Sequence, residues 1–172
     1  DLLLVAGDLF HRQPLLRELK EVDGLFASLE RTQVVLIAGN HDYMRRDSYY
    51  RTFQWSANVH FLGSASVEAV ELPALETAVY GCSYHERQIR QPLYDSAPAA
   101  GRQRREILLA HGGDADHIPV SREALAGLGY DYVALGHIHM PQVVIPGLAA
   151  YAGALEPTDR NDTGHHGYIQ GE

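Results

Sequence analysis

The chain has 172 residues, of which 45% are apolar and 21% charged, a globular composition that excludes collagen-like, coiled-coil and disordered classes. Aspartate and glutamate number 22 against 14 lysines and arginines, so the formal net charge is -8 and a broad positive surface for polyanions is excluded. No apolar run approaches the roughly 20 residues of a membrane helix, and the single cysteine, Cys82, fits a reducing compartment. We therefore expect a cytoplasmic protein without membrane contact. Any phosphate chemistry would need bound metal ions as its source of positive charge.

Two apolar runs that end in glycine, at 2–6 and 33–38, predict buried strands. Between them, Pro14 stands where a first helical residue would, and apolar residues then recur at three- and four-residue spacing, which predicts an amphipathic helix. The predicted apolar face consists of Leu15, Leu16, Leu19, Val22, Leu25, Phe26 and Leu29. A strand, a helix and a strand in this order favour a right-handed βαβ crossover.

The rest of the chain alternates short apolar runs with turns. The pattern predicts strands at 58–62, 67–72, 77–84, 106–110, 131–136, 142–145, 149–152 and 167–170. Residues 92–105 are rich in proline, alanine, glycine and arginine and predict an exposed connection. Ser121 can cap a short helix that runs to Leu128. No repeat or linker is visible, so residues 1–172 are expected to form one α/β domain.

Four of the predicted buried strands end directly in a polar cluster. The clusters are Gly7-Asp8 with His11, Gly39-Asn40-His41-Asp42, His111-Gly112-Gly113 and Gly136-His137-Ile138-His139. Sites in open α/β sheets form at the carboxyl ends of strands, so these loops are expected to converge. Each motif alone also fits an ordinary turn or strand end, but the four together predict a metal site. Carboxylate, amide and imidazole groups suit manganese, iron or zinc.

On these motifs the chain resembles the calcineurin-like metallophosphoesterases and, among them, the SbcD-type exonuclease subunits. The segments that carry the resemblance are Gly7-Asp8-Leu9-Phe10-His11, Gly39-Asn40-His41-Asp42, Ala110-His111-Gly112, Asp131-Tyr132-Val133, Ala134-Leu135-Gly136-His137-Ile138-His139 and Tyr151-Ala152-Gly153-Ala154-Leu155-Glu156. The resemblance implies an α/β fold, a metallophosphoesterase-type β-sandwich of mixed sheets flanked by helices. It also implies two divalent metal ions, with manganese expected and iron or zinc compatible.

The resemblance assigns metal ligands residue by residue. Asp8 would be the carboxylate that bridges both ions. One ion would be completed by Asn40, His111 and His137, and His139 would belong to the other ion.

Three further residues receive catalytic roles by the same resemblance. His41 would stabilise the phosphate or protonate the leaving oxygen, and Asp42 would orient His41. His11 would help to place the substrate phosphodiester. Water activated by the metals would be the attacking group, which agrees with general two-metal chemistry.

The family pattern begins with a strand that carries Asp-x-His, and no such motif precedes Gly7. The chain begins at Asp1 rather than methionine and enters a strand-like run at once, so we expect an N-terminally truncated, partial domain that lacks its first strand. On that expectation the second metal keeps only Asp8 and His139 as ligands, and the activity of the fragment is weak or absent.

The leading hypothesis is a manganese-dependent phosphodiesterase that cleaves DNA, with an SbcC-type ATPase as partner and a homodimeric assembly, all implied by the resemblance. One alternative is a phosphatase or small-nucleotide phosphodiesterase of the same fold, which the acidic net charge favours. Another is an inactive fragment that serves as a binding module, which the absent Asp-x-His motivates.

Two groups of polar residues near the motifs are not assigned to the site. Asp114, Asp116 and His117 are interpreted as a solvated acidic loop rather than as part of the site. Arginines follow the first two site loops and could contact phosphates, although a solvated surface explains them equally well. These are Arg12, Arg45, Arg46 and Arg51.

Overall fold

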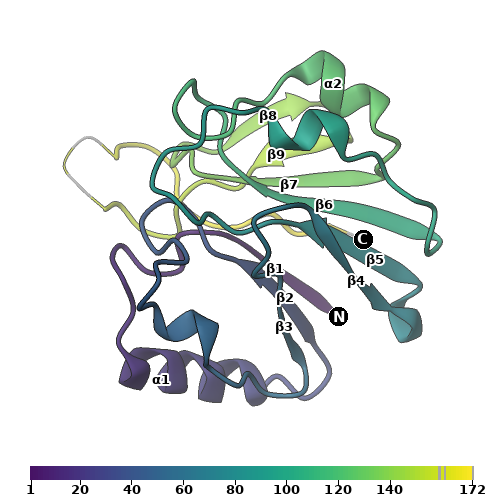
Figure 1. Ribbon diagram of the computed structural model, residues 1–172. Coiled ribbons are helices and arrows are strands. Elements are labelled where there is room, and N and C mark those ends of the chain that lie inside the picture. The colour runs from purple at the N-terminus through teal and green to yellow at the C-terminus, as the bar shows by residue number, and fades with distance from the viewer. Residues whose placement is uncertain (159, 161, 172) are drawn as a thin grey trace.

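The computed structural model describes residues 1–158, 160 and 162–171. Two β-sheets pack face to face, with α1 against the outer side of one sheet and α2 over the other, as Figure 1 shows. This mixed α/β sandwich confirms the predicted fold class. The two α-helices have 12 and 6 residues, and no helix in the described ranges is long and apolar enough to cross a membrane.

The smaller sheet contains β1 (Leu2–Ala6), β2 (Gln33–Ile37) and β3 (Val59–Phe61), all parallel. Helix α1 (Leu16–Ala27) connects β1 to the parallel strand β2, which confirms the predicted βαβ unit. Side chains of β2 alternate between the two faces of the sheet. Val35 and Ile37 pack between the sheets, whereas Val34 and Leu36 join a cluster with Phe26 of α1.

The larger sheet has six strands in the order β4-β5-β6-β7-β9-β8. These strands are β4 (Glu68–Leu72), β5 (Thr77–Gly81), β6 (Arg105–His111), β7 (Tyr132–Gly136), β8 (Gln142–Ile145) and β9 (Ala149–Tyr151). The four inner strands are parallel, and β4 and β8 pair antiparallel at the edges. The carboxyl ends of the parallel strands therefore point the same way, which gathers their loops at one edge.

Short helices complete the fold. Three 3₁₀ turns lie at η1 (Tyr49–Arg51), η2 (Pro73–Leu75) and η3 (Leu93–Ser96). Helix α2 (Arg122–Gly127) begins as predicted, because the Ser121 hydroxyl accepts a hydrogen bond from the backbone N–H of Ala124 at 3.2 Å.

The connection at 92–105 differs from the expected exposed stretch. It contains η3, and within η3 the side chain of Tyr94 is fully buried. The Tyr94 hydroxyl accepts from the backbone N–H of His111 at 2.9 Å and donates to the His111 carbonyl at 3.1 Å. A single aromatic anchor thus ties the connection to β6, and the polar composition around it concealed that anchor.

Three other expectations change. Residues 167–170 form no strand. Strand β1 is an edge strand with mostly half-buried side chains, since it pairs with β2 alone. Helix α1 buries a narrower stripe than predicted, and Leu15, Leu16, Leu25 and Leu29 are exposed.

A candidate metal site at the strand ends

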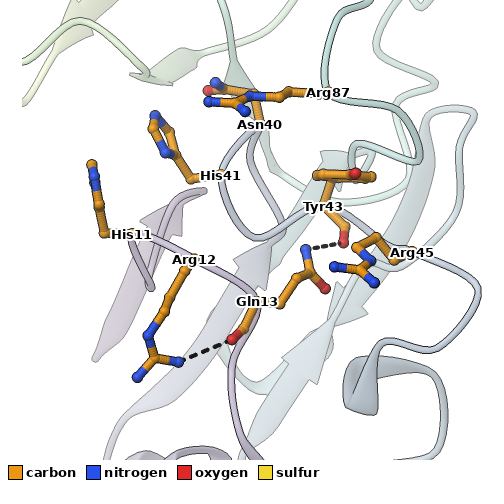
Figure 2. A pocket seen from close by; sticks show the side chains of 8 residues that line it. All are labelled: His11, Arg12, Gln13, Asn40, His41, Tyr43, Arg45 and Arg87. Carbon is orange, nitrogen blue, oxygen red and sulfur yellow. Dashed lines mark hydrogen bonds between the residues drawn. The ribbon is translucent and has the colours of Figure 1, made fainter.

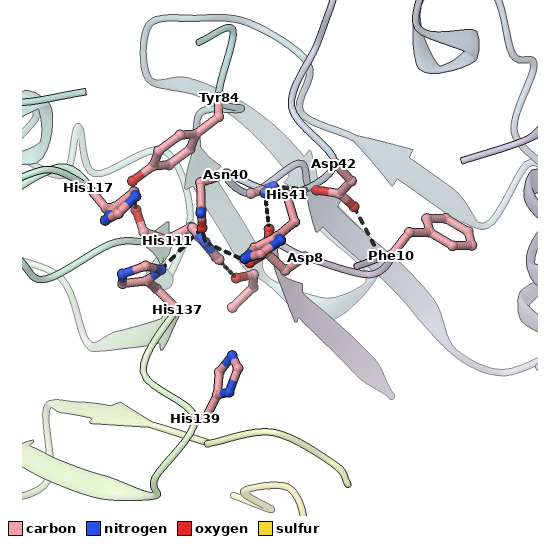
Figure 3. A network of polar contacts seen from close by, with 12 residues as sticks. Asp8, Phe10, Asn40, His41, Asp42, Tyr84, His111, His117, His137 and His139 are labelled. Carbon is pink, nitrogen blue, oxygen red and sulfur yellow. Dashed lines mark hydrogen bonds and ion pairs between the residues drawn. The ribbon is translucent and has the colours of Figure 1, made fainter. Parts of the chain in front are cut away.

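The predicted ligands come from the ends of four parallel strands. Asp8 follows β1, Asn40 follows β2, His111 is the last residue of β6, and His137 follows β7 (Figure 3). One ligand atom from each of Asp8, His111 and His137 lies within 4.8 Å of the others. Asp8 and Asn40 follow strands of the three-stranded sheet, whereas His111 ends and His137 follows a strand of the six-stranded sheet. The site therefore spans the two layers of the sandwich.

The Asn40 side chain lies at the centre of the ligand set. Its Oδ1 atom is 2.9 Å from Nε2 of His111 and 3.2 Å from Nδ1 of His137. The carboxylate Oδ2 of Asp8 is 3.4 Å from the same Nε2 atom. Four oxygen and nitrogen atoms therefore face a common point.

The hydrogen bonds of His111 show what this arrangement can hold. Its Nδ1 atom lies 2.8 Å from the carbonyl oxygen of Ala6, which can only accept, so in the neutral ring the hydrogen is on Nδ1. The Nε2 lone pair then points at the oxygens of Asn40 and Asp8. Lone pairs that converge in this way repel one another unless a cation lies among them, so the donor set fits a divalent metal ion.

Nearby charges and burial favour the ionised form of Asp8 and the neutral form of His137. Burial raises the pKa of the Asp8 carboxyl, but without a metal a hydrogen on Nε2 of His111 would bond to Asp8, and this hydrogen bond, the charge of that ring and the N–H of His41 outweigh burial and hold the pKa below its usual value. A bound cation would take the place of the hydrogen on Nε2. Burial lowers the pKa of His137, against the opposing effect of Asp114. An ionised carboxylate and a neutral imidazole are the forms that bind metal.

Two of these ligands, Asp8 and His137, have a strained backbone, as do Glu76 and Ile118 elsewhere among the described residues. Asp8 has φ of 51° and His137 has φ of 93°, in the left-handed region that non-glycine residues rarely adopt. Such strain costs about 1–3 kcal/mol per residue and clusters at functional sites. Glycine at position 39 is also required, because a Cβ there would stand 2.2 Å from Oδ1 of Asp8.

His139 does not belong to this group. Its Nδ1 atom lies 2.9 Å from Oδ2 of Asp162, which also accepts a hydrogen bond from the Thr158 hydroxyl at 2.6 Å. Figure 3 shows the ring on the same side as His137 but set apart from the other ligands. Its expected role at a second ion stays a prediction.

His41 and His11 lie together beside the ligand set. Their rings stack with centroids 4.5 Å apart and planes 24° apart. The backbone N–H of His41 donates to Oδ1 of Asp8 at 2.8 Å. Burial lowers the pKa of His41, although the Asp8 charge opposes this change. The two rings are placed to act on the same ligand, next to the metal-type donors.

Asp42 contacts different atoms from those expected. Its carboxylate accepts from the N–H of Gly39 at 2.8 Å, from the N–H of Phe10 at 3.2 Å and from the Tyr50 hydroxyl at 2.9 Å. In the described ranges no hydrogen bond joins it to the His41 ring. Asp42 instead fastens the Asp8 loop to the Asn40 loop, because its two oxygens bind backbone in both. Burial, and then the Asp8 charge, raise its pKa to about 6.

A pocket of about 370 Å³ opens beside the two stacked histidines (Figure 2). It is lined by His11, Arg12, Gln13, Asn40, His41, Tyr43, Arg45 and Arg87. Arg12 is paired with Glu18 at 2.6 Å and Arg45 with Asp47 at 2.9 Å. Arg87 has no hydrogen bond or ion pair in the described part of the chain, and Figure 2 shows it reaching over Asn40. Of the three arginines that line the pocket, Arg87 is thus the one with no charge partner among residues 1–158, 160 and 162–171.

Two residues near the site, Arg87 and Asp114, were not among the site residues predicted from the sequence. Arg87 comes from the loop after β5, about fifty residues from the motifs it approaches, and no local signal marks it. Asp114 lies three positions after His111, and its carboxylate is 2.8 Å from Nε2 of His137. Arg51, which the sequence also suggested as a phosphate contact, instead donates to the carbonyls of Met44 and Arg45.

Comparisons with known proteins show which family the chain is similar to. Residues 1–141 match the family model described as calcineurin-like phosphoesterase. A curated relative, described as the uncharacterized metallophosphoesterase YhaO of Bacillus subtilis (strain 168), is 31% identical over 190 aligned residues. The alignment covers 98% of this chain and 44% of the relative, so the chain spans less than half of that protein.

Proposed function

This chain belongs to the calcineurin-like phosphoesterase family, and we propose that it is a metal-dependent phosphodiesterase that cleaves DNA. The observation that carries the proposal is the convergence of Asp8, Asn40, His111 and His137 beside a pocket that is lined by His41 and by Arg87, whose guanidinium has no partner in the described part of the chain. Metal ligands next to an anion-binding pocket suit a phosphoester substrate.

The chain's own residues supply the first metal site. The Asp8 carboxylate and the Asn40 amide give oxygen ligands, and the neutral rings of His111 and His137 give nitrogen ligands. Divalent cations held there would supply activation of the attacking water and neutralisation of charge on the phosphate. For a second ion the resemblance gives Asp8 as bridge and His139 as ligand, and we propose manganese for both.

His41 is proposed as the proton donor to the leaving oxygen. Cleavage breaks the bond between phosphorus and that oxygen, which then needs a proton, and a positioned imidazole accelerates such transfers by about 10²–10⁴-fold. The stacked His11 ring limits the rotation of His41 and shares the pocket with it. His11 would thus help to position the phosphodiester, while Asp42 acts on the loop backbone.

DNA is proposed as the substrate because the pocket beside His41 places Arg87, which has no ion pair among the described residues, next to the proposed metal ligands in a chain of net charge -8. Recognition of a polyanion by an acidic protein needs local positive charge, which Arg87 and the bound cations would supply together. The SbcD-like segments at 7–11 and 151–156 support the same substrate. By that resemblance we also propose an SbcC-type ATPase and a second copy of the subunit as partners.

The test is hydrolysis of linear double-stranded DNA in the presence of Mn²⁺, with a phosphomonoester measured in parallel. The variant His41→Ala serves as the catalytic control, since its ring contributes no atom to the proposed metal ligand set. We expect weak, Mn²⁺-dependent DNA cleavage by the unaltered protein, and a further loss of at least about 10²-fold in kcat for His41→Ala. Bound metal should be counted in both proteins and should not differ.

The outcomes separate the alternatives. Turnover of the phosphomonoester without DNA cleavage would move the protein to the phosphatases, the class that its acidic charge favours. Metal binding without any hydrolysis would support the inactive binding module. DNA cleavage that survives His41→Ala would refute the proposed proton donor.

A further inference from the structure

We propose that Asp114 is a positioning residue of the metal site, whose carboxylate holds His137 in the tautomer that presents Nδ1 to the cation. The inference rests on the proposed metal function. Asp114 follows β6 and lies outside the ligand set described above, and its sequence context indicated only a solvated loop.

The two ring nitrogens of His137 face different partners. Nδ1 lies 3.2 Å from Oδ1 of Asn40, on the side of the metal ligands, and Nε2 lies 2.8 Å from Oδ2 of Asp114. A neutral imidazole has one N–H and one lone pair, and an ionised carboxylate can only accept. The hydrogen is therefore on Nε2, and the lone pair of Nδ1 is directed at the cation.

Asp114 is itself held in place by its own loop. Its Oδ1 atom accepts from the backbone N–H groups of Asp116 at 2.8 Å and His117 at 3.0 Å. The ring Nδ1 of His117 lies 2.9 Å from both carboxylate oxygens. The carboxylate would therefore keep its position even without His137, which is what a group that orients another side chain requires.

Asp114, His117 and His137 could also form a separate metal site, because ligand atoms of these three residues lie within 4.8 Å of one another. His137, however, has only one lone pair to give. On its Nδ1 side three further ligands converge, from Asp8, Asn40 and His111. On its Nε2 side the carboxylate already receives hydrogen bonds from backbone and from His117. Asp114 is therefore better explained as the hydrogen-bond acceptor of His137 than as a metal ligand.

The other two metal-type histidines have an equivalent acceptor. The Ala6 carbonyl faces Nδ1 of His111 at 2.8 Å, and Asp162 faces Nδ1 of His139 at 2.9 Å. Every histidine that the family resemblance names as a ligand therefore has one nitrogen bound to a protein acceptor. At metal centres, an acceptor bound to the nitrogen that does not face the metal fixes the orientation of the ring and raises the basicity of the ligating nitrogen.

The experiment compares metal affinity in the variants Asp114→Ala and Asp114→Asn with that of the unaltered protein. Co²⁺ would be titrated and followed by its visible absorption, and Mn²⁺ by calorimetry. We expect Asp114→Ala to weaken the tightest-bound ion by about 10–100-fold at unchanged stoichiometry. Asp114→Asn should restore most of the affinity, since its amide oxygen still accepts from Nε2–H.

Asp116→Ala is the matched control, because Asp116 is an exposed carboxylate of the same loop whose side chain pairs with Arg90 at 2.7 Å. It should bind metal like the unaltered protein. Equal affinity in Asp114→Ala, equal losses in Asp114→Ala and Asp116→Ala, or no rescue by Asp114→Asn would each overturn the proposal. Loss of one whole equivalent of metal would favour the separate Asp114 site instead. Hydrolysis is not the readout, so a protein that binds metal without turning over DNA would refute the proposed function and leave this inference standing.

Discussion

The carbonyl oxygen of Ala6 lies 2.8 Å from Nδ1 of His111, a residue 105 positions further along the chain. Ala6 ends β1 in one sheet, and His111 ends β6 in the other. This contact joins the two layers directly behind the ligand set and determines which nitrogen of His111 carries the hydrogen.

Replacement of His111 by alanine should therefore affect both metal binding and folding. A ligand is removed, so affinity for the first ion should fall by more than the roughly 10–100-fold expected for loss of an outer contact. The Ala6 carbonyl is also left without its partner, which should lower the metal-free unfolding free energy by about 1–3 kcal/mol. Denaturant unfolding without metal and a Co²⁺ titration measure the two effects.

His60→Ala is the control for that experiment, since His60 is a half-buried histidine of β3 that contacts Gln33. Its metal affinity should equal that of the unaltered protein. Unchanged Co²⁺ binding in His111→Ala would remove His111 from the ligand set.

Arg87→Gln should weaken substrate binding more than turnover. The exposed guanidinium reaches over Asn40 and has no partner in the described residues, so it is available to a phosphate oxygen. Loss of one hydrogen bond to a charged group costs about 1.5–3 kcal/mol, which corresponds to about a 10–100-fold rise in KM, with kcat within a few fold. Steady-state kinetics and competition by inorganic phosphate measure it.

Arg104→Gln is the comparison, because Arg104 is an exposed arginine paired with Glu76, and both directly precede strands (β6 and β5) whose other ends lead into the site loops. A KM for Arg87→Gln equal to that of Arg104→Gln would contradict a role for Arg87 in binding.

The surroundings of Glu106 predict that the folded state loses stability in acid. Burial raises the pKa of its carboxyl, but the Tyr80 hydroxyl at 2.5 Å and the N–H groups of Gly101 and Gln103 outweigh it and lower the pKa below 4.5. A carboxyl whose pKa is lower in the folded state stabilises that state above its unfolded pKa and ceases to do so as pH falls through the folded value.

Melting temperatures of the unaltered protein and of Glu106→Gln, measured from pH 7 to pH 3, test this prediction. The variant should be less stable at pH 7, and the difference should shrink as pH falls below about 4.5. A difference that stays constant over that range would show that the charge of Glu106 contributes nothing.

Much of the fold was accessible from the sequence because local signals there agree with the tertiary structure. Strands β1 and β2 and helix α2 begin or end at the glycine, apolar and capping residues that predicted them. The four site loops were also predictable, since parallel strands bring their carboxyl ends together. Which side chains are buried was harder to predict from the sequence, as Tyr94 shows. The position of its side chain depends on a hydrogen bond with the backbone of His111, which a local sequence pattern does not encode.

The site itself was predictable only in part. Ligands such as Asp8 and Asn40 stand in short motifs, whereas Arg87 reaches the pocket from a separate loop. Asp42 illustrates a second limit. Its position in the motif suggested a partner for His41, yet its hydrogen bonds go to backbone groups of two loops that come together only in the folded chain.

The division of the ligand set between two sheets has a thermodynamic consequence. An ion bound by Asp8, Asn40, His111 and His137 would link the two sheets, because the sheets could not separate without breaking its coordination bonds. Its binding free energy would then add to the resistance of the whole sandwich to unfolding, by RT ln(1 + [L]/Kd) at a given free metal concentration. Chelation would loosen both layers at once, and the melting temperature of the protein would serve as a gauge of metal occupancy.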